Sequence, residues 1–512
     1  MTRFTLLLLF IYASLVAFAQ SGKNAAPQQW GVYEVVLSGP STGNPFMEVA
    51  LDATFKNGNE SIEVPGFYDG GGTYRVRFSP PSQGRWTYQT KSNAAALSGK
   101  KGAFRSLAPT GPNHGPVQIV NTHYLRHADG SPYYAVGTTA YQWTSVKQSV
   151  QAKTLETLAK APFNKIRMCV FPKHYQYGNE TEPWMYPFER EGSTNDLARP
   201  NYAFFQNFDQ RVAQLSDLGI QADVILFHPY DSWGYSKMGK EMNEKYVRYM
   251  IARLSAYRNV WWSLANEWDV PSIKTAIDWE GIGTLLQKED PHQRLRGIHN
   301  WHDSEDHFFD HTRPWVTHVS AQTSRFYDAI KWRKQYHKPL LFDEMRYEGD
   351  VKSGWGNMKG QEMASYFWMA GLSGGYPTHG DTFRNDADEA TEVRWWAKGG
   401  TLMGESPERI RYFKSVMEQA PVTQMDPELI ARGDPKKLST NLYIFSKPGA
   451  YYLAYVAEAN QDIELNLPGT KDYTVDVLDT WTMKTIEQSV VKPGVYRYKT
   501  TTPYTAIRLY VD

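Results

Sequence analysis

The chain has 512 residues, a length typical of about three domains. It is 41% hydrophobic and 21% charged, which argues against a disordered, collagen-like or coiled-coil protein. Its 55 Lys and Arg residues balance 54 Asp and Glu residues, so it lacks the basic excess of a nucleic-acid or anionic-membrane binder. The single cysteine excludes an internal disulfide framework and a cysteine-based zinc site.

Residues 1–19 have the pattern of a secretory signal peptide. Arg3 supplies a positive charge, an apolar run extends from Phe4 to Val16, and small residues precede a cleavage site before Gln20. The run is shorter than the roughly 20 apolar residues of a transmembrane helix, and no later run is long enough. We therefore expect an exported protein of the bacterial periplasm or medium, without a membrane span.

Residues 25–110 are predicted to form an antiparallel β-sandwich. Tyr74, Val76 and Phe78 alternate with arginines, which is the period-two pattern of a half-buried strand. Turns rich in Gly and Pro separate this run from similar ones, as in small sandwich domains. A Pro- and Gly-rich linker at residues 108–112 marks the end of the domain.

Residues 115–408 alternate short apolar runs with longer amphipathic stretches. Eight strands are predicted, at Tyr133–Thr139, Lys165–Phe171, Gln221–Phe227, Val260–Asn266, Leu295–His299, Trp315–Ala321, Pro339–Glu344 and Gly375–Gly380. The clearest helices between them are Phe205–Leu218, Glu244–Tyr257, Lys274–Lys288, Arg325–Tyr336 and Gln361–Leu372. This succession indicates a (β/α)₈ barrel, with a doubly wound open sheet as the alternative. No glycine-rich phosphate-binding motif follows a strand, which argues against a nucleotide-binding open sheet.

Residues 412–512 are again rich in strand patterns, such as Tyr451–Val456 and 506–511, separated by Pro-Gly turns. A second antiparallel sandwich is the prediction. The expected architecture is therefore a multidomain α/β plus β protein, with a central TIM barrel flanked by N- and C-terminal antiparallel β-sandwich domains.

Two of the predicted barrel strands end in a glutamate. Glu267 follows the fourth strand and Glu344 ends the seventh. Active sites of such barrels lie at the carboxyl ends of the strands, so both side chains are expected at one central mouth. Two carboxyl groups about 5–5.5 Å apart suit retaining glycoside hydrolysis, in which one is a protonated acid and the other an ionised nucleophile.

The sequence Asn266-Glu267 after strand four, with Glu344 at strand seven, resembles clan GH-A, a superfamily of retaining (β/α)₈ glycoside hydrolases. The resemblance implies that Glu267 is the acid/base, Glu344 the nucleophile and Asn266 a ligand of the sugar 2-hydroxyl. It also implies that Arg167, in strand two, bonds the nucleophile and that His228 faces the substrate. The three-domain layout resembles a group with a DUF5060-like sandwich, a DUF4038-like barrel and a C-terminal DUF5605 or collagen-binding-like module, near which apiosidase-like enzymes lie.

The chain departs from that superfamily at strands six and eight. The superfamily often has a tyrosine after strand six that bonds the nucleophile, and here no tyrosine stands there. His318, Gln322 or Tyr347 is the candidate replacement. The usual strand-eight tryptophan is also missing, since residues 376–381 stand in its place and include His379.

Further candidates for substrate binding stand after predicted strands. They are the tryptophans Trp143, Trp233, Trp268, Trp301 and Trp355 and the histidines His228, His299 and His379. Each tryptophan is either a platform for a sugar ring or a packing residue, and each histidine either a ligand or a structural residue. Arg167 has a similar alternative as a salt-bridge partner inside the barrel.

No metal-binding or cofactor motif is recognised, and no G-x-S-x-G motif is present. We therefore expect no metal and no cofactor, and a carbohydrate as the partner. The alternatives to a retaining hydrolase are a non-catalytic glycan-binding protein on a degenerate barrel and a transglycosylase with the same residues. The sequence indicates neither the sugar nor the oligomeric state.

Overall fold

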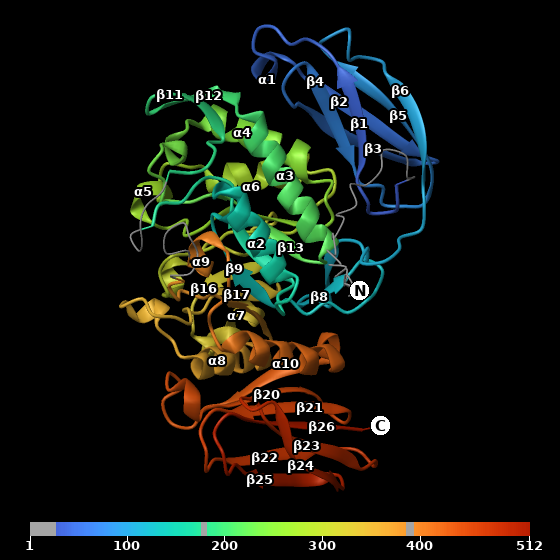
Figure 1. Ribbon diagram of the computed structural model, residues 1–512. Helices are drawn as coiled ribbons and strands as arrows, with labels where there is room; N and C mark the ends of the chain where they lie inside the picture. The colour runs from blue at the N-terminus through green and yellow to red at the C-terminus, as the bar shows by residue number, and fades with distance from the viewer. Residues whose placement is uncertain (1–26, 176–181, 386–393, 512) are drawn as a thin grey trace, which may run out of the picture.

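The N-terminal domain consists of antiparallel strands and one short helix, α1 (Pro45–Glu48). The computed structural model describes residues 27–175, 182–385 and 394–511 (Figure 1), so the predicted signal peptide lies outside the described residues. The strands are β1 (Tyr33–Ser38), β2 (Leu51–Asn57), β3 (Glu60–Tyr68), β4 (Thr73–Phe78), β5 (Gly84–Ser92) and β6 (Lys101–Ser106). They are hydrogen-bonded in the order β1-β4-β3-β2-β5-β6.

Strand β3 changes partner along its length. It pairs with β2 through Pro65 and with β4 from Gly66 onward. A Cβ atom at Gly66 would lie 2.7 Å from the Leu51 side chain, so the close approach at this point requires glycine. Phe55, Phe78 and Trp86 are buried in the core of the domain. The predicted antiparallel domain is thereby confirmed.

The central domain is a barrel of eight parallel strands, as predicted. They are β9 (Gly137–Thr139), β10 (Lys165–Cys169), β13 (Gln221–Phe227), β14 (Val260–Ala265), β15 (Arg296–Gly297), β16 (Val319–Gln322), β17 (Leu340–Glu344) and β18 (Gly375–His379). Their order is β15-β14-β13-β10-β9-β18-β17-β16, and a parallel bridge between His299 and Ser320 joins the two ends. This closure excludes the alternative of an open sheet.

Helices surround the barrel and connect its strands. They are α2 (Gln148–Leu158), α3 (Tyr202–Asp217), α4 (Lys240–Leu254), α5 (Pro271–Lys274), α6 (Trp279–Glu289), α7 (Ala329–Tyr336), α8 (Gly360–Leu372), α9 (Trp395–Lys398) and α10 (Ser406–Gln419). The predicted helix Lys274–Lys288 begins later than expected, at Trp279. The cause is a side-chain cap, because Asp278 accepts a hydrogen bond from the Gly281 amide at 2.9 Å. Two hairpins complete the domain: β7 (Val117–Val120) with β8 (Tyr124–His127), and β11 (Phe188–Glu191) with β12 (Thr194–Pro200).

The C-terminal domain is antiparallel, as predicted, and packs against barrel helix α8 (Figure 1). One sheet has the order β19-β20-β21-β26-β23-β24, and β22 pairs with β25. The strands are β19 (Asp426–Ile430), β20 (Leu442–Lys447), β21 (Tyr451–Val456), β22 (Asp462–Leu467), β23 (Tyr473–Asp479), β24 (Lys484–Val491), β25 (Gly494–Lys499) and β26 (Thr505–Tyr510). Tyr455 stacks on Trp368 at 5.7 Å and donates a hydrogen bond to Ser365 at 2.8 Å. Within the described ranges, no helix is long and apolar enough to cross a bilayer.

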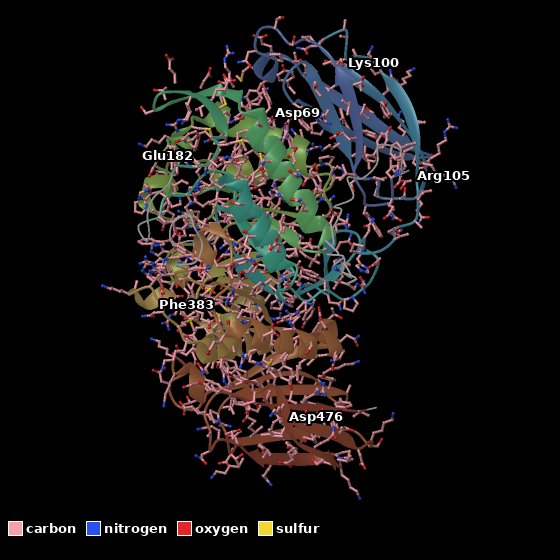
Figure 2. All side chains as sticks on the ribbon, in the orientation of Figure 1. Asp69, Lys100, Arg105, Glu182, Phe383 and Asp476 are labelled. Atoms are coloured by element: carbon pink, nitrogen blue, oxygen red, sulfur yellow. The ribbon has the colours of Figure 1, made fainter. Side chains whose placement is uncertain are left out.

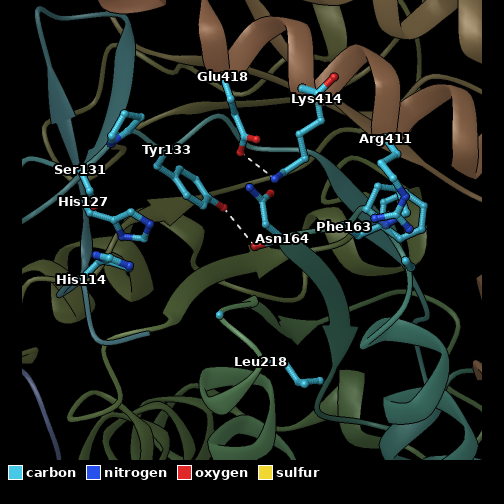
Figure 3. Close-up of a pocket in the computed structure, with 15 residues that line it drawn as sticks. His114, His127, Ser131, Tyr133, Phe163, Asn164, Leu218, Arg411, Lys414 and Glu418 are labelled. Carbon is cyan, nitrogen blue, oxygen red and sulfur yellow. Dashed lines mark hydrogen bonds and ion pairs between the residues drawn. The ribbon is translucent and has the colours of Figure 1, made fainter. Parts of the chain in front are cut away.

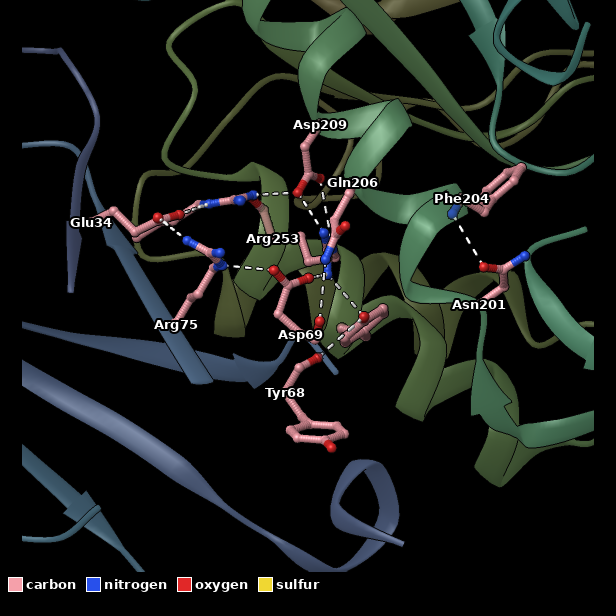
Figure 4. Close-up of polar contacts among 11 residues, drawn as sticks. Glu34, Tyr68, Asp69, Arg75, Asn201, Phe204, Gln206, Asp209 and Arg253 are labelled. Atoms are coloured by element: carbon pink, nitrogen blue, oxygen red, sulfur yellow. Dashed lines mark hydrogen bonds and ion pairs between the residues drawn. The ribbon is translucent and has the colours of Figure 1, made fainter. Parts of the chain in front are cut away.

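A buried charge network joins the N-terminal domain to the barrel (Figure 4). Asp69, which follows β3, lies at the boundary between the two domains (Figure 2). Arg253 of α4 pairs with Asp69 at 2.8 Å and with Asp209 of α3 at 2.5 Å. Arg77 of β4 pairs with the same Asp209 at 2.8 Å. All four side chains are buried. Each charge lost its hydration on folding, and the ion pairs with its partners compensate for that loss.

We expect Asp209→Ala to lower the free energy of unfolding by about 3 kcal/mol, because it leaves two buried arginines short of a counter-charge. Chemical denaturation followed by tryptophan fluorescence measures the loss. The control is Asp196→Ala, which removes an exposed ion pair with Arg199 and should cost less than about 1 kcal/mol. Equal effects of the two variants would contradict this account of the interface.

Candidate active site

A pocket of about 470 Å³ lies at the carboxyl ends of the barrel strands. Its lining includes Glu267, two residues after β14, and Glu344, at the end of β17. Residues at the end of or after β17 and six other strands complete the wall: Tyr141, Lys173, His174, Tyr175, Tyr230, Trp301, Asp303, Gln322, Thr323, Ser324, Met345, Arg346, Tyr347, Trp355 and Trp396. The sequence prediction that both glutamates face one central mouth agrees with this placement.

A second hollow, of about 460 Å³, lies at the opposite end of the barrel (Figure 3). Tyr133, Asn164 and Leu218 line it, and each precedes a barrel strand. Polar groups there are paired with one another: the Lys414 ammonium lies 2.6 Å from Glu418, and Tyr133 donates to the Asn164 carbonyl at 3.2 Å. Because barrel enzymes work at the carboxyl ends of their strands, the pocket with the two glutamates is the candidate active site.

Glu344 is held by a cation and a phenol. The Arg167 Nη1 atom lies 3.4 Å from Glu344 Oε1, and the Tyr141 hydroxyl donates a hydrogen bond to the same oxygen. Arg167 also donates to Tyr141 at 3.2 Å and, through Nη2, to Asn266 Oδ1 at 3.2 Å. Arg167 is fully buried. It contacts Glu344 and Tyr141, which line the pocket, and Asn266, which is buried and is not among the described lining residues.

The residue before Glu344 is anchored in the barrel interior. Asp343 Oδ1 accepts from Lys165 Nζ at 2.6 Å, and Oδ2 accepts from Ser320 at 2.5 Å. Lys165 also lies 2.8 Å from Asp223. Burial alone would raise the pKa of Asp343, but Lys165 and Arg167 hold that pKa well below its usual range. The ionised, hydrogen-bonded Asp343 pins the end of β17, and with it the backbone of Glu344.

Glu267 has a different environment. Burial, together with the charge of Glu344, raises the pKa of Glu267 to about 7, although Lys173 and Tyr230 work against the shift. One carboxyl oxygen, Oε2, is buried and has no hydrogen-bond partner within the described part of the chain. The backbone of Glu267 is left-handed, with φ of 58°, which is unusual for a residue other than glycine and occurs preferentially at functional sites.

Aromatic rings form much of the pocket wall. Trp355 stacks on Trp396 at 5.5 Å, and Tyr347 and Tyr175 contact this pair edge-on or tilted. The Lys173 ammonium lies 3.9 Å from the ring centre of Tyr141, 4.6 Å from that of Tyr230 and 5.3 Å from that of Tyr175. Such a wall offers apolar faces together with a few polar groups, as small-molecule sites commonly do.

Several predicted substrate-binding residues are not among the described residues that line the pocket. Trp143 is buried in the core, and Trp268 packs edge-on against Phe309 at 5.2 Å. His228 is buried, contacts the Phe171 carbonyl at 3.1 Å and has its pKa lowered to about 4 by burial. His299 is buried inside the barrel, where burial lowers its pKa, and His379 lies between Thr138 and Glu348. These rings are buried in the protein and do not line the pocket.

The three candidate replacements for the missing strand-six tyrosine differ in whether they line the pocket. Tyr347 and Gln322 line the pocket, whereas His318 is buried beside Trp261. The direct partner of Glu344 is Tyr141, two residues after β9, and the Tyr347 hydroxyl lies 3.3 Å from that of Tyr141. Tyr141 was not among the predicted site residues, although its place just after the first barrel strand was a usable signal. Lys173, Tyr230 and Trp396 were likewise missed.

No group of three or more His, Cys, Asp or Glu side chains is arranged to hold a metal ion within the described residues. Two carboxyl groups in unlike environments lie at the pocket. One is paired with a guanidinium and a phenol, and the other has a raised pKa. That division suits one ionised and one protonated carboxyl at the same time.

Family models match all three domains. The model described as "Apiosidase-like, catalytic domain" matches residues 120–424, which is more than half of the chain. The chain belongs to the apiosidase-like family. Two domains of unknown function flank that match, DUF5060 at residues 26–93 and DUF5605 at residues 441–510, as the sequence resemblance implied.

Solved structures agree with this assignment. A Bacteroides vulgatus protein assigned to the glycoside hydrolases is 35% identical, with a TM-score of 0.84 over 95% of this chain and 99% of that one. A family 5 glycoside hydrolase from the same species is 15% identical, with a TM-score of 0.60 over 78% and 93% of the two chains, and shows a shared fold. No match was found among curated proteins. The family and the 35% identical structure support glycoside hydrolase activity for this apiosidase-like chain.

The raised pKa of Glu267 gives a stability prediction. Between about pH 4.5 and pH 7 the folded chain binds more protons at this carboxyl than the unfolded chain, so its contribution becomes unfavourable as the pH rises. We expect Glu267→Gln, which stays neutral, to gain about 3 kcal/mol over the wild type between pH 4 and pH 8.

Urea denaturation of both proteins at several pH values measures this difference. The matched control is Glu191→Gln, on the exposed end of β11, which should differ from the wild type by a constant amount. A difference between Glu267→Gln and the wild type that does not change with pH would refute the raised pKa.

Proposed function

We propose that this chain is an exported glycoside hydrolase that cleaves a plant, algal or microbial glycan by a retaining double displacement. The observation that carries the proposal is the division between the two glutamates of one pocket. Glu344 is paired with Arg167 and Tyr141, while Glu267 has a pKa of about 7. A retaining mechanism needs one carboxylate that attacks and one carboxylic acid that donates a proton.

In the first step, a Glu344 oxygen attacks the anomeric carbon. The bond from that carbon to the leaving oxygen breaks, and this oxygen takes the proton of Glu267. In the second step, Glu267, now ionised, removes a proton from water. The water oxygen attacks the anomeric carbon and releases the sugar from Glu344, which regains its charge. The configuration at the anomeric carbon is inverted twice and is therefore retained.

The other residues of the site support these two roles. Arg167 and Tyr141 each donate a hydrogen bond to Glu344 and so hold its carboxylate in one orientation. Asn266 has its Oδ1 atom on Arg167, and its Nδ2 atom is buried without a partner among the described residues. This amide is available to a sugar 2-hydroxyl, which is the role that the clan GH-A resemblance implies for Asn266.

A transglycosylase would use the same residues, with a sugar hydroxyl in place of water in the second step. A glycan-binding protein without activity would need neither the Arg167 pairing nor the raised pKa of Glu267. The substrate class, a plant, algal or microbial glycan, is likewise proposed. The family description makes glycosides of apiose an obvious member of any test panel.

The test is a screen of aryl glycosides, including an aryl apioside, and of plant and algal polysaccharides. We expect Glu344→Gln to lose essentially all turnover of the substrate that the wild type cleaves. Glu267→Gln should lose about 10²–10⁴-fold on substrates with poor leaving groups, which is the usual contribution of general acid–base catalysis. Equal activity of wild type and Glu344→Gln would eliminate the proposed nucleophile.

The stereochemical outcome tests the mechanism separately. Proton NMR of the first product should show the anomer with the configuration of the substrate. A 2-deoxy-2-fluoro glycoside of the same sugar should form a stable ester whose mass maps to the peptide containing Glu344. A product of inverted configuration would overturn the double displacement and leave hydrolysis itself standing.

A further inference from the structure

One aromatic residue of the pocket differs from the others in its exposure. Trp301 is 43% exposed, whereas Trp396 is 6% exposed and Tyr141 1%. An exposed indole offers an apolar face that a bound molecule can cover. Because Trp301 also lines the pocket that contains both glutamates, its ring is available to a molecule bound there.

The backbone that carries Trp301 is fixed. The buried carboxylate of Asp269 accepts hydrogen bonds from the Trp301 amide at 2.5 Å and the His302 amide at 3.3 Å. The same carboxylate lies 2.8 Å from Nδ1 of His307. Three contacts from one acid hold the loop in place, so little conformational entropy is lost when a ligand covers the indole.

The same loop is tied to the segment that carries Glu267. Asp269 stands two residues after Glu267, and the Trp268 amide donates to the His299 carbonyl at 2.9 Å. By contrast, the aromatic wall of Tyr141, Tyr175, Tyr347, Trp355 and Trp396 comes from loops after β9, β10, β17 and β18. Trp301 follows β15, four strands from β9 around the barrel, so it faces that wall across the mouth.

We propose that Trp301 is the stacking platform for the sugar on the leaving-group side of the scissile bond. The inference rests on the proposed function, in which Glu267 protonates the leaving oxygen. The leaving group must then lie beside the Glu267 loop, which is the loop bonded to Trp301. The buried aromatic wall near Glu344 encloses the sugar on the other side. The substrate class is therefore an oligosaccharide or polysaccharide, or another glycoside whose leaving group is itself a sugar ring.

The experiment compares two substrates of the wild type and of Trp301→Ala. One is an oligosaccharide fragment of the polysaccharide from the panel that the wild type cleaves, and the other is the glycosyl fluoride of the sugar released from it. Fluoride has no ring to stack and needs little help from the acid. We expect Trp301→Ala to lower kcat/KM at least about 10-fold on the oligosaccharide, the scale typical of a truncated tryptophan contact, and to leave the fluoride nearly unchanged.

The matched control is Trp184→Ala. Trp184 is 41% exposed but does not line the pocket, so its removal should leave both substrates unaffected. Equal losses on both substrates by Trp301→Ala, or no loss on the oligosaccharide, would overturn the platform while the hydrolase proposal stands. Failure of the wild type to cleave either substrate would overturn the hydrolase proposal and the platform with it.

Discussion

The Lys165 ammonium inside the barrel is the contact on which the candidate site depends. It lies between the carboxylates of Asp223 and Asp343, where all three charges are buried. Buried ions are costly unless they are paired and hydrogen-bonded. Lys165 pairs with both carboxylates, and Asp343 accepts hydrogen bonds from Lys165 and Ser320. Because Asp343 directly precedes Glu344, the pairing that satisfies the barrel interior also fixes the carboxylate of the pocket.

Arg167 connects this buried group of charges to the pocket. Its guanidinium contacts Glu344, Tyr141 and Asn266, and no such cation pairs with Glu267 among the described contacts. The two glutamates are thus chemically identical residues in different electrostatic environments. Glu344 is paired with Arg167, and its negative charge is one of the causes that raise the pKa of Glu267. Burial is the largest cause of the raised pKa of Glu267, and the Arg167 contact distinguishes Glu344 from it.

The fold and the two glutamates could be predicted because their signals are local. Buried parallel strands are continuous apolar runs, and a glutamate directly after such a run must lie at its carboxyl end. The remaining pocket residues could not be predicted with equal success. Trp143 and Trp396 both follow barrel strands, yet Trp143 is buried in the core and Trp396 lines the pocket. Which way such a ring turns depends on the packing of whole loops, and a short sequence window does not contain that information.

The tyrosine that is missing after strand six is replaced from another strand, which a short sequence window also could not show. Any strand whose end reaches Glu344 can supply a phenol that bonds it. Here β9 does so through Tyr141, and the Tyr347 hydroxyl, from the loop after β17, lies 3.3 Å from that of Tyr141. No tyrosine stands after strand six, but a tyrosine hydroxyl, that of Tyr141, still donates a hydrogen bond to Glu344. A departure from a family motif is therefore weak evidence against a catalytic site until the neighbouring strand ends have been examined for the same functional group.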